Sequence, residues 1–293
     1  MKVAVFGASG TVGRSVLAEL ARVNDVVAVS RREQRETDGL TWKIADATDR
    51  DSVARVLDGV EVAYYLVHSL GSPEFEEQDL RAAETTAREA ERAGLSQLVY
   101  LGGLGDDSAD LSPHLRSRRE TGLRLASTSV PVTTLRAAMV IGRGSAAFET
   151  IVALVDRLPA MLAPRWIATR TQPVALSDVA AYLVGVCGLE PALGVAYDVG
   201  GPEVMTYREM MERIARLRGK HPLIVEVPVL TPYLSSLWLH LVTPVNAGVA
   251  RPLIEGLRTE TVVRDDRIRR LLPIDLTPFD VAARSALDQP EGS

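Results

Sequence analysis

The sequence has only one cysteine, Cys187, among its 293 residues. A single thiol excludes an internal disulfide framework and a cysteine-rich zinc site. Cys187 falls in the apolar, helix-like run AAYLVGVCGL. We therefore expect it to be a buried structural thiol rather than a nucleophile.

The sequence also lacks an excess of positive charge, because 33 lysines and arginines stand against 38 acidic residues, for a net charge of −5. Proteins that bind nucleic acid usually carry a basic surface. Arg116, Arg118 and Arg119 form a local basic cluster that would favour such binding, but the overall charge weighs against it. No nucleic-acid partner is predicted.

A third absence is an uninterrupted apolar run of about 20 residues, the length that a membrane-spanning helix needs. Residues 223–257 are very apolar but contain four prolines. They are expected to form helices that line an apolar pocket, a subunit interface or a membrane-surface patch. The short apolar run at the N-terminus ends at Gly7 without a cleavage signal, which predicts a strand and a cytoplasmic protein. Monomer and homodimer both stay open.

The regular return of strand and helix patterns over the first 140 residues predicts an α/β fold, a Rossmann-type doubly wound parallel sheet with helices on both faces. The domain boundaries are predicted as 1–160 for the dinucleotide-binding domain and 161–293 for a smaller, mostly helical substrate region interleaved with the sheet. Strands are expected at 2–6, 25–30, 40–45, 60–67, 97–103, 132–136 and 196–199, and helices at 49–57, 74–94, 112–127, 177–189 and 206–219. Ser112, Ser177 and Thr206 are the expected helix caps.

The first sixteen residues, MKVAVFGASGTVGRSV, place a glycine turn between a strand and a helix. Gly7 allows the sharp turn, Gly10 lets a phosphate approach the backbone, and Gly13 lets helix and strand pack closely. Unpaired N–H groups at the positive end of the helix dipole then hold the phosphates. The residues of this turn expected to bind a dinucleotide are Gly7, Ser9, Gly10, Thr11, Val12 and Gly13.

The end of the second strand carries Ser30, Arg31 and Arg32 where NAD-binding versions of the fold have an acidic residue. A guanidinium group can donate two hydrogen bonds to a phosphate. This pattern favours NADP(H) over NAD(H); the alternative is a solvated basic turn.

Further cofactor contacts are expected at the carboxyl ends of the third and fourth strands. Asp46 is either a partner for the adenine amino group, beside Ala47, or part of the cap of the next helix. Leu66, Val67 and His68 follow the fourth strand, and Ser69 is assigned to the substrate pocket. His68 is a candidate proton donor or ribose contact, and the alternative is an ordinary loop histidine.

The glycine turn, Arg31, Asp46-Ala47 and the stretch DVGGPEVMTYREMM at 198–211 resemble the short-chain dehydrogenase/reductase superfamily, in its atypical, NmrA-like NAD(P)H-binding branch. The resemblance covers nearly the whole chain. It implies a doubly wound sheet with a C-terminal region that closes over a substrate cleft.

Active members of that superfamily carry a serine after the fifth strand and a Tyr-x-x-x-Lys pair on the next helix. Here the serine position resembles Gly102 or Gly103, which join the expected cofactor contacts, and the segment HLRSRRE places His114 and Arg118 at the other two positions. Arg118 can hold ribose hydroxyls but cannot relay a proton. His114 is either a general acid or a residue that only packs near the helix start.

Two functions follow. The first is an NADPH-dependent oxidoreductase that transfers hydride to an apolar carbonyl, enone or quinone-like substrate, with Met139, Phe148 and Trp166 lining the pocket. The second is a nucleotide-bound sensor or assembly protein without turnover. The missing Ser-Tyr-Lys set favours the second; His114 and the apolar C-terminal half favour the first.

Overall fold

A computed structural model describes residues 1–35, 39–68, 75–105, 111–157, 160–163, 165–226 and 256–288. Its centre is a seven-stranded sheet in the order β11-β6-β5-β4-β1-β2-β3, in which every neighbouring pair is parallel. The strands are β1 (Lys2–Phe6), β2 (Asp25–Ser30), β3 (Leu40–Ile44), β4 (Val62–Tyr65), β5 (Gln97–Gly103), β6 (Val132–Ala137) and β11 (Ala196–Val199). The predicted doubly wound sheet is therefore confirmed.

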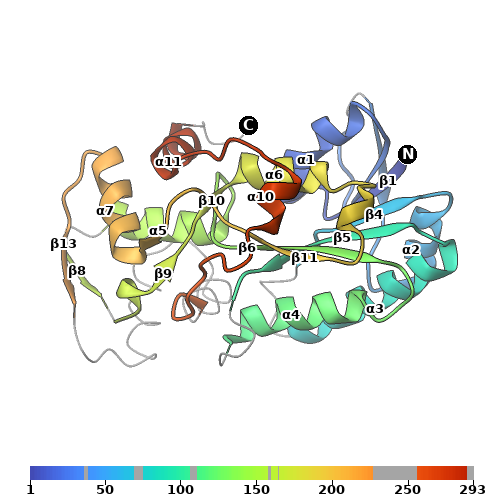
Figure 1. Cartoon of the computed structure of the whole chain (residues 1–293), viewed down its shortest axis with the longest axis horizontal. Coiled ribbons are helices and arrows are strands. Elements are labelled where there is room, and N and C mark those ends of the chain that lie inside the picture. The colour runs from blue at the N-terminus through green and yellow to red at the C-terminus, as the bar shows by residue number, and fades with distance from the viewer. Residues whose placement is uncertain are drawn as a thin grey trace.

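Helices cover both faces of this sheet (Figure 1). One face packs against α1 (Thr11–Ala21) and α6 (Leu176–Gly185), and the other against α2 (Arg50–Leu57), α3 (Phe75–Ala93) and α4 (Pro113–Leu125). Since both faces are buried, the central strands are apolar at nearly every position, as β1 and β4 show.

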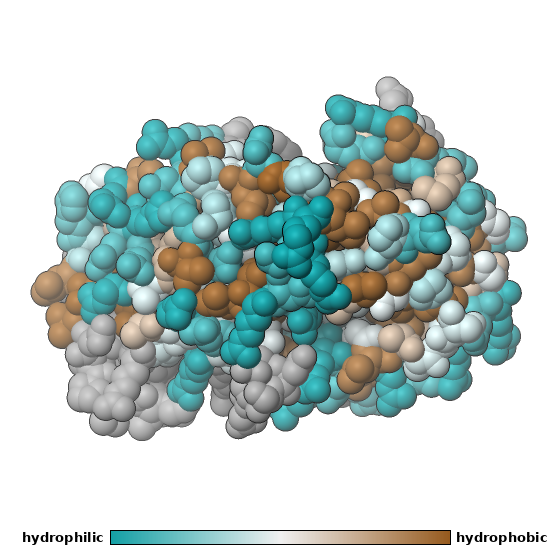
Figure 2. All heavy atoms as spheres, in the orientation of Figure 1, coloured by the Kyte–Doolittle hydropathy of each residue, from teal (hydrophilic) through white to brown (hydrophobic). Residues whose placement is uncertain are grey.

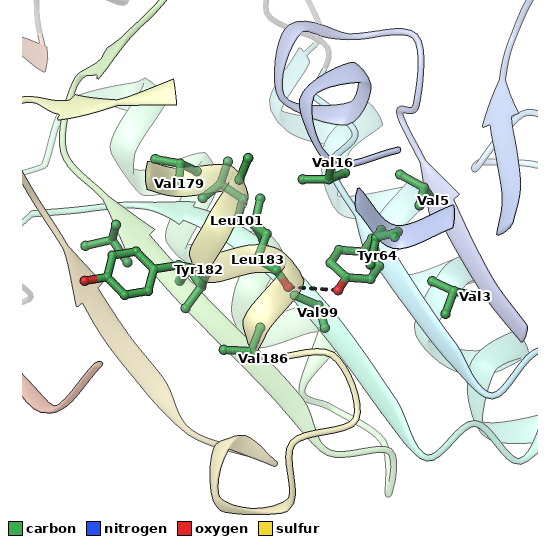
Figure 3. Close-up of a cluster of buried hydrophobic side chains, with 14 of the residues drawn as sticks. Val3, Val5, Val16, Tyr64, Val99, Leu101, Val179, Tyr182, Leu183 and Val186 are labelled. Carbon is green, nitrogen blue, oxygen red and sulfur yellow. Dashed lines mark hydrogen bonds between the residues drawn. The ribbon is translucent and has the colours of Figure 1, made fainter. Parts of the chain in front are cut away.

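The core under α1 and α6 joins residues from distant parts of the chain. Val179, Leu183 and Val186 lie against the β1, β4 and β5 side chains (Figure 3). The buried Tyr64 hydroxyl donates a 2.8 Å hydrogen bond to the carbonyl of Leu183, drawn as a dashed line in Figure 3. The C-terminal half thus supplies a covering helix, α6, and an edge strand, β11, to the sheet of the N-terminal half.

A second hydrophobic core lies beyond the sheet, around α5, α7 and α11 (Figure 1). Its helices are α5 (Ala146–Arg157), α7 (Tyr207–Leu217) and α11 (Phe279–Asp288), with a short 3-10 turn at Arg165–Ala168 (η1). Small strand pairs join this region, namely β7 (Val140–Ile141) with β10 (Val174–Ala175), β9 (Arg170–Thr171) with β12 (Met205–Thr206), and β8 (Ala160–Ala163) with β13 (Leu223–Glu226). A second 3-10 turn, η2 (Glu190–Ala192), packs with the sheet core through Ala192.

Charged side chains gather over α10 (Arg267–Leu271), which forms a hydrophilic band in the middle of the face shown in Figure 2. Arg267 pairs with Asp265 at 2.6 Å, and Arg270 pairs with Asp266. Such exposed pairs contribute little stability. This band is a solvated face.

Local structure agrees with most of the predicted caps and differs at three places. Ser112 and Thr206 cap α4 and α7 as predicted. The prediction for Ser177 is wrong, because α6 begins one residue earlier, at Leu176, with Ala175 as its N-cap. The same helix ends at Gly185, so Cys187 lies in the turn that follows it, where burial raises the pKa of its thiol. Residues 223–226 form a strand instead of the predicted helix, and 227–255 lie outside the described residues.

Candidate dinucleotide and substrate site

The glycine turn has the geometry of a phosphate cradle. Gly7 has a φ of +84°, and a Cβ atom there would lie 2.7 Å from the carbonyl oxygen of Leu66. At Gly13 an added Cβ would lie 2.2 Å from the carbonyl oxygen of Gly7, so only glycine lets α1 approach β1 this closely. No side chain caps α1 at Gly10, and the first N–H groups of the helix are therefore left for a ligand. These residues fit a bound dinucleotide.

A polar cleft of about 550 Å³ runs along the carboxyl ends of β1, β2, β3 and β4. Parallel sheets of this order bind ligands where the strand order reverses, which here is between β1 and β4. The predicted cofactor residues that line the cleft are Gly7, Ser9, Gly10, Ser30, Arg31, Asp46, Ala47, Leu66, Val67 and His68.

One end of the polar cleft carries two arginines. Arg31 follows β2, and Arg81 comes from α3. The pKa of Asp46, between them, is lowered, first by hydrogen bonds from Thr48 and then by these two arginines. Arg32 is exposed and does not line the cleft, and its backbone is hydrogen-bonded to the Ser30 hydroxyl.

An apolar pocket of about 320 Å³ adjoins the polar cleft, and His68 lines both. Among the predicted residues, Thr11, Val12, Gly102, Gly103, His114, Arg118 and Met139 line this pocket. Leu101, Leu104, Leu115, Tyr207, Leu257 and Thr261 complete much of its wall. A polar cleft that shares a wall residue with an apolar pocket of this size can hold a dinucleotide beside a small apolar molecule.

Three titratable side chains form a chain of contacts beside the apolar pocket. Nδ1 of His68 lies 2.7 Å from Oδ2 of Asp79, and Nε2 of His68 lies 3.3 Å from Nδ1 of His114. Asp79 is 2% exposed, on the side of α3 that faces the sheet. Burial lowers the pKa of His68, and the bond to Asp79 opposes this effect. Burial lowers the pKa of His114 well below its usual value, with further lowering from His68 and Arg118.

The residues at the serine and lysine positions have structural roles of their own. A Cβ at Gly103 would lie 3.0 Å from the Leu115 side chain, so there is little space for a serine there. Arg118 donates from its guanidinium to the carbonyl of Leu101 and lies 5.4 Å from the centre of the Tyr100 ring. Its charge therefore sits at the pocket wall, where a lysine would stand in the superfamily pattern.

Two of the predicted pocket residues, Phe148 and Trp166, lie elsewhere. Phe148 is 2% exposed and packs in the second core, and the partly buried Trp166 packs against the same core, 6.0 Å from the Tyr207 ring. Neither lines the apolar pocket. Ser69 lies outside the described residues.

Sequence reasoning missed Asp79 and Arg81, because it interpreted the charges of α3 as a solvated face, and it gave no role to Gln78, which also lines the polar cleft. Asp79 stands in the stripe of small residues that α3 buries, one turn before Ala82 and Ala83. A carboxylate in the apolar stripe of a helix was the signal that could have found it.

The sheet order, the glycine turn and the two adjoining cavities define a dinucleotide-binding protein of the Rossmann class. Residues 7–139 match a family described as NAD(P)H-binding. An Arabidopsis thaliana relative, NADH dehydrogenase (ubiquinone) 1 alpha subcomplex subunit 9, mitochondrial, is 24% identical over 94% of this chain and 73% of that protein. A Streptomyces griseus relative, (4-alkanoyl-5-oxo-2,5-dihydrofuran-3-yl)methyl phosphate reductase, is 28% identical over 74% of this chain and 73% of that protein.

The crystal structure of a Citrobacter sp. triphenylmethane reductase complexed with NADP(H) superposes with a TM-score of 0.76, at 17% identity, over 98% of this chain and 100% of that one. Residues 7–139 are therefore similar to NAD(P)H-binding domains, and the chain shares its fold with this solved structure.

Among the residues that the structure describes, no helix is long and apolar enough to cross a membrane. They also contain no group of three or more histidine, cysteine or acidic side chains that would suit a metal ion.

Proposed function

We propose that this protein is an NADPH-dependent oxidoreductase that reduces an apolar carbonyl, enone or quinone-like substrate. The observation that carries the proposal is the continuity of the two cavities at His68, with a dinucleotide cleft on one side and the pocket around Met139 and Leu257 on the other. The Streptomyces griseus relative, which is a reductase by name, supports the same reaction class.

Each part of the site has a distinct task in this proposal. Gly10, Thr11 and Val12 hold the phosphates, Arg31 and Arg81 lie at the adenosine end, and Arg118 holds ribose hydroxyls. NADPH supplies a hydride when bound. The apolar walls exclude water and orient the substrate, and His114 holds the proton that the substrate oxygen takes up.

The preference for NADPH is tested by titrating the purified protein with NADPH and NADH. A hydrogen bond to a charged group contributes about 1.5–3 kcal/mol, so Arg31→Ala is expected to weaken NADPH binding about tenfold or more and to leave NADH binding nearly unchanged. Arg32→Ala is the matched control, because the neighbouring arginine lies outside the cleft. Equal affinities of the wild type for both cofactors would contradict the NADPH assignment.

Turnover is tested by following NADPH oxidation with a panel of aldehydes, enones and quinones. A positioned general acid accelerates a reaction by about 10²–10⁴-fold, and His114→Gln is expected to lose that factor in kcat while it keeps its NADPH affinity. His221→Gln, at an exposed histidine, serves as the control. Tight NADPH binding without oxidation of any compound would contradict the oxidoreductase assignment.

The second candidate is a protein that binds NAD(P)H without turnover, as a sensor or an assembly subunit. Two observations favour it: the serine, tyrosine and lysine positions carry glycine, His114 and Arg118, and the Arabidopsis thaliana relative is by name a subunit of a larger complex. Under this assignment NADPH raises the melting temperature, and no compound of the panel accelerates its oxidation.

A further inference from the structure

We propose that Asp79, His68 and His114 form a buried proton relay, in which Asp79 and His68 are positioning residues that deliver one proton through Nε2 of His114 into the apolar pocket. The proposal rests on the proposed function, because it gives the reduced substrate its proton. Beyond the proposed function, it assigns Asp79 and His68 a role in positioning the proton of His114. It also assigns a tautomer to each of the two histidine rings.

The contacts determine which ring nitrogens carry hydrogen. A carboxylate only accepts, so Nδ1 of His68 donates to Asp79 across 2.7 Å. With Nδ1 protonated, neutral His68 accepts at Nε2, and Nδ1 of His114 donates to it across 3.3 Å. This leaves Nε2 of His114 as the ring nitrogen available to a ligand in the pocket that the ring lines.

One added proton reverses the direction of the inner hydrogen bond. When His68 is protonated on both nitrogens, its Nε2 donates to Nδ1 of His114, and His114 carries its hydrogen on Nε2. Reduction adds a hydride to the substrate carbon, and the electron pair of the former C=O or conjugated π bond moves to the oxygen. That oxygen takes the hydrogen of His114 Nε2, and His114 takes the Nε2 hydrogen of His68. Both rings end neutral, His68 keeps its bond to Asp79, and water restores the proton.

The charges around His68 and His114 favour the binding of a single proton by the pair of rings. Asp79 favours a protonated His68, whereas Arg118, on α4, opposes charge on both rings. Among the described residues, the other titratable groups in this packing are Tyr65 and Tyr100, from β4 and β5, and burial raises the pKa of both phenols. Two protonated imidazoles in contact would repel each other in this buried site. The pair is therefore expected to bind its first proton as a unit.

Ring tautomers are measured by long-range ¹H–¹⁵N correlation spectra of the full-length ¹⁵N-labelled protein, with the four histidines assigned by single substitutions. At neutral pH both His68 and His114 are expected as the Nδ1–H tautomer. His221, which is exposed, is the internal control and shows the usual Nε2–H form of a solvated ring. An Nε2–H form of either relay ring, or separate titration of the two rings, would overturn the proposal.

The carboxylate is tested by Asp79→Asn, with Glu77→Gln as the matched loss of an exposed charge on the same helix. Removal of a partner charge disfavours the imidazolium, so the titration of the pair is expected to move to lower pH by about one unit or more. Glu77→Gln leaves it in place. An unmoved titration in a folded Asp79→Asn variant overturns the proposal. Should that variant not fold, the wild-type tautomers decide alone.

With the fastest compound of the oxidation panel, kcat/KM falls as pH rises through the titration of the pair, because the unprotonated relay has no proton to give. In Asp79→Asn this fall in kcat/KM is expected at lower pH than in the wild type. In Glu77→Gln it is expected at the wild-type pH. If kcat/KM of a folded Asp79→Asn variant falls at the same pH as that of the wild type, the relay is contradicted. The ring spectra can be recorded without turnover, so the two proposals can fail separately. Histidine rings that titrate together in a protein that oxidises no NADPH would refute only the proposed function. Rings that titrate separately in an active enzyme would refute only the relay.

Discussion

Gly10 and Gly13 lie three residues apart in the same turn, but a methyl group added at each would meet different surroundings. At Gly13 it would collide with backbone, 2.2 Å from the Gly7 carbonyl oxygen and 2.7 Å from Cα of Ala8. At Gly10 the nearest atom would be the Gly7 oxygen at 3.3 Å, a contact that a small adjustment relieves.

Gly13→Ala is therefore expected to reduce stability by about 1–3 kcal/mol, the range for overpacked cores, and to weaken NADPH binding as α1 moves away. Gly10→Ala is expected to cost much less stability but to lose affinity, because under the proposed function a methyl group at this cleft-lining residue would crowd the phosphates. Urea unfolding and NADPH titration of both variants measure the two effects separately. Equal stability losses would show that the close approach of α1 to β1 is not specific to Gly13.

The residues that line the polar cleft were predictable from sequence, and the contacts of His68 only in part. Gly7 and Arg31 directly follow the buried strands β1 and β2, and Asp46 lies two residues after β3, so the strand ends determine where these residues lie. Asp79 reaches His68 only because α3 packs beside β4, a contact between segments that sequence pattern alone does not place. His68 and His114 are 46 residues apart, and their contact likewise depends on the assembled fold.

At the scale of elements, the strands were predicted most accurately because burial on both faces requires continuous apolar runs. β1, β2, β5 and β11 have the predicted bounds. Whether a residue caps a helix depends on the backbone conformation of that single residue, and the sequence pattern identifies caps less reliably than strands. Thr206 has its reciprocal partner Glu209, which forms a capping box, whereas Ser177 bonds to Asp178 inside α6.

The two hydroxyl residues form a matched pair of substitutions. Thr206→Ala is expected to cost about 1 kcal/mol, the usual loss for a helix cap, because the first turn of α7 loses the acceptor for Glu209 N–H. Ser177→Ala is expected to cost less than half of that, since no cap is lost. Free energies of unfolding from urea titration measure both. A larger loss at Ser177 would contradict the observed start of α6.

On the scale of the whole molecule, a boundary near residue 160 does not separate the two cores, because each core takes residues from both sides of it. β11 lies at the edge of the central sheet beside β6. α6 packs against α1, and both helices cover the same face of that sheet. A fragment of residues 1–160 would expose the core side chains that Leu183 and Val186 cover, and would leave the Tyr64 hydroxyl without its acceptor.

We therefore expect that fragment not to fold and the full chain to unfold in one cooperative step. Trp42 lies in β3 and Trp166 packs against the second core, so each tryptophan reports on a different region. Variants in which Phe replaces all tryptophans except one should give coincident urea midpoints by fluorescence, and circular dichroism should agree with both. The coupling has a physical cause: Asp178 of α6 accepts hydrogen bonds from Thr277, just before α11, so loss of the second core would remove contacts from the helix that covers the sheet. Two separated midpoints, or a folded 1–160 fragment, would show instead that the sheet is stable without its C-terminal cover.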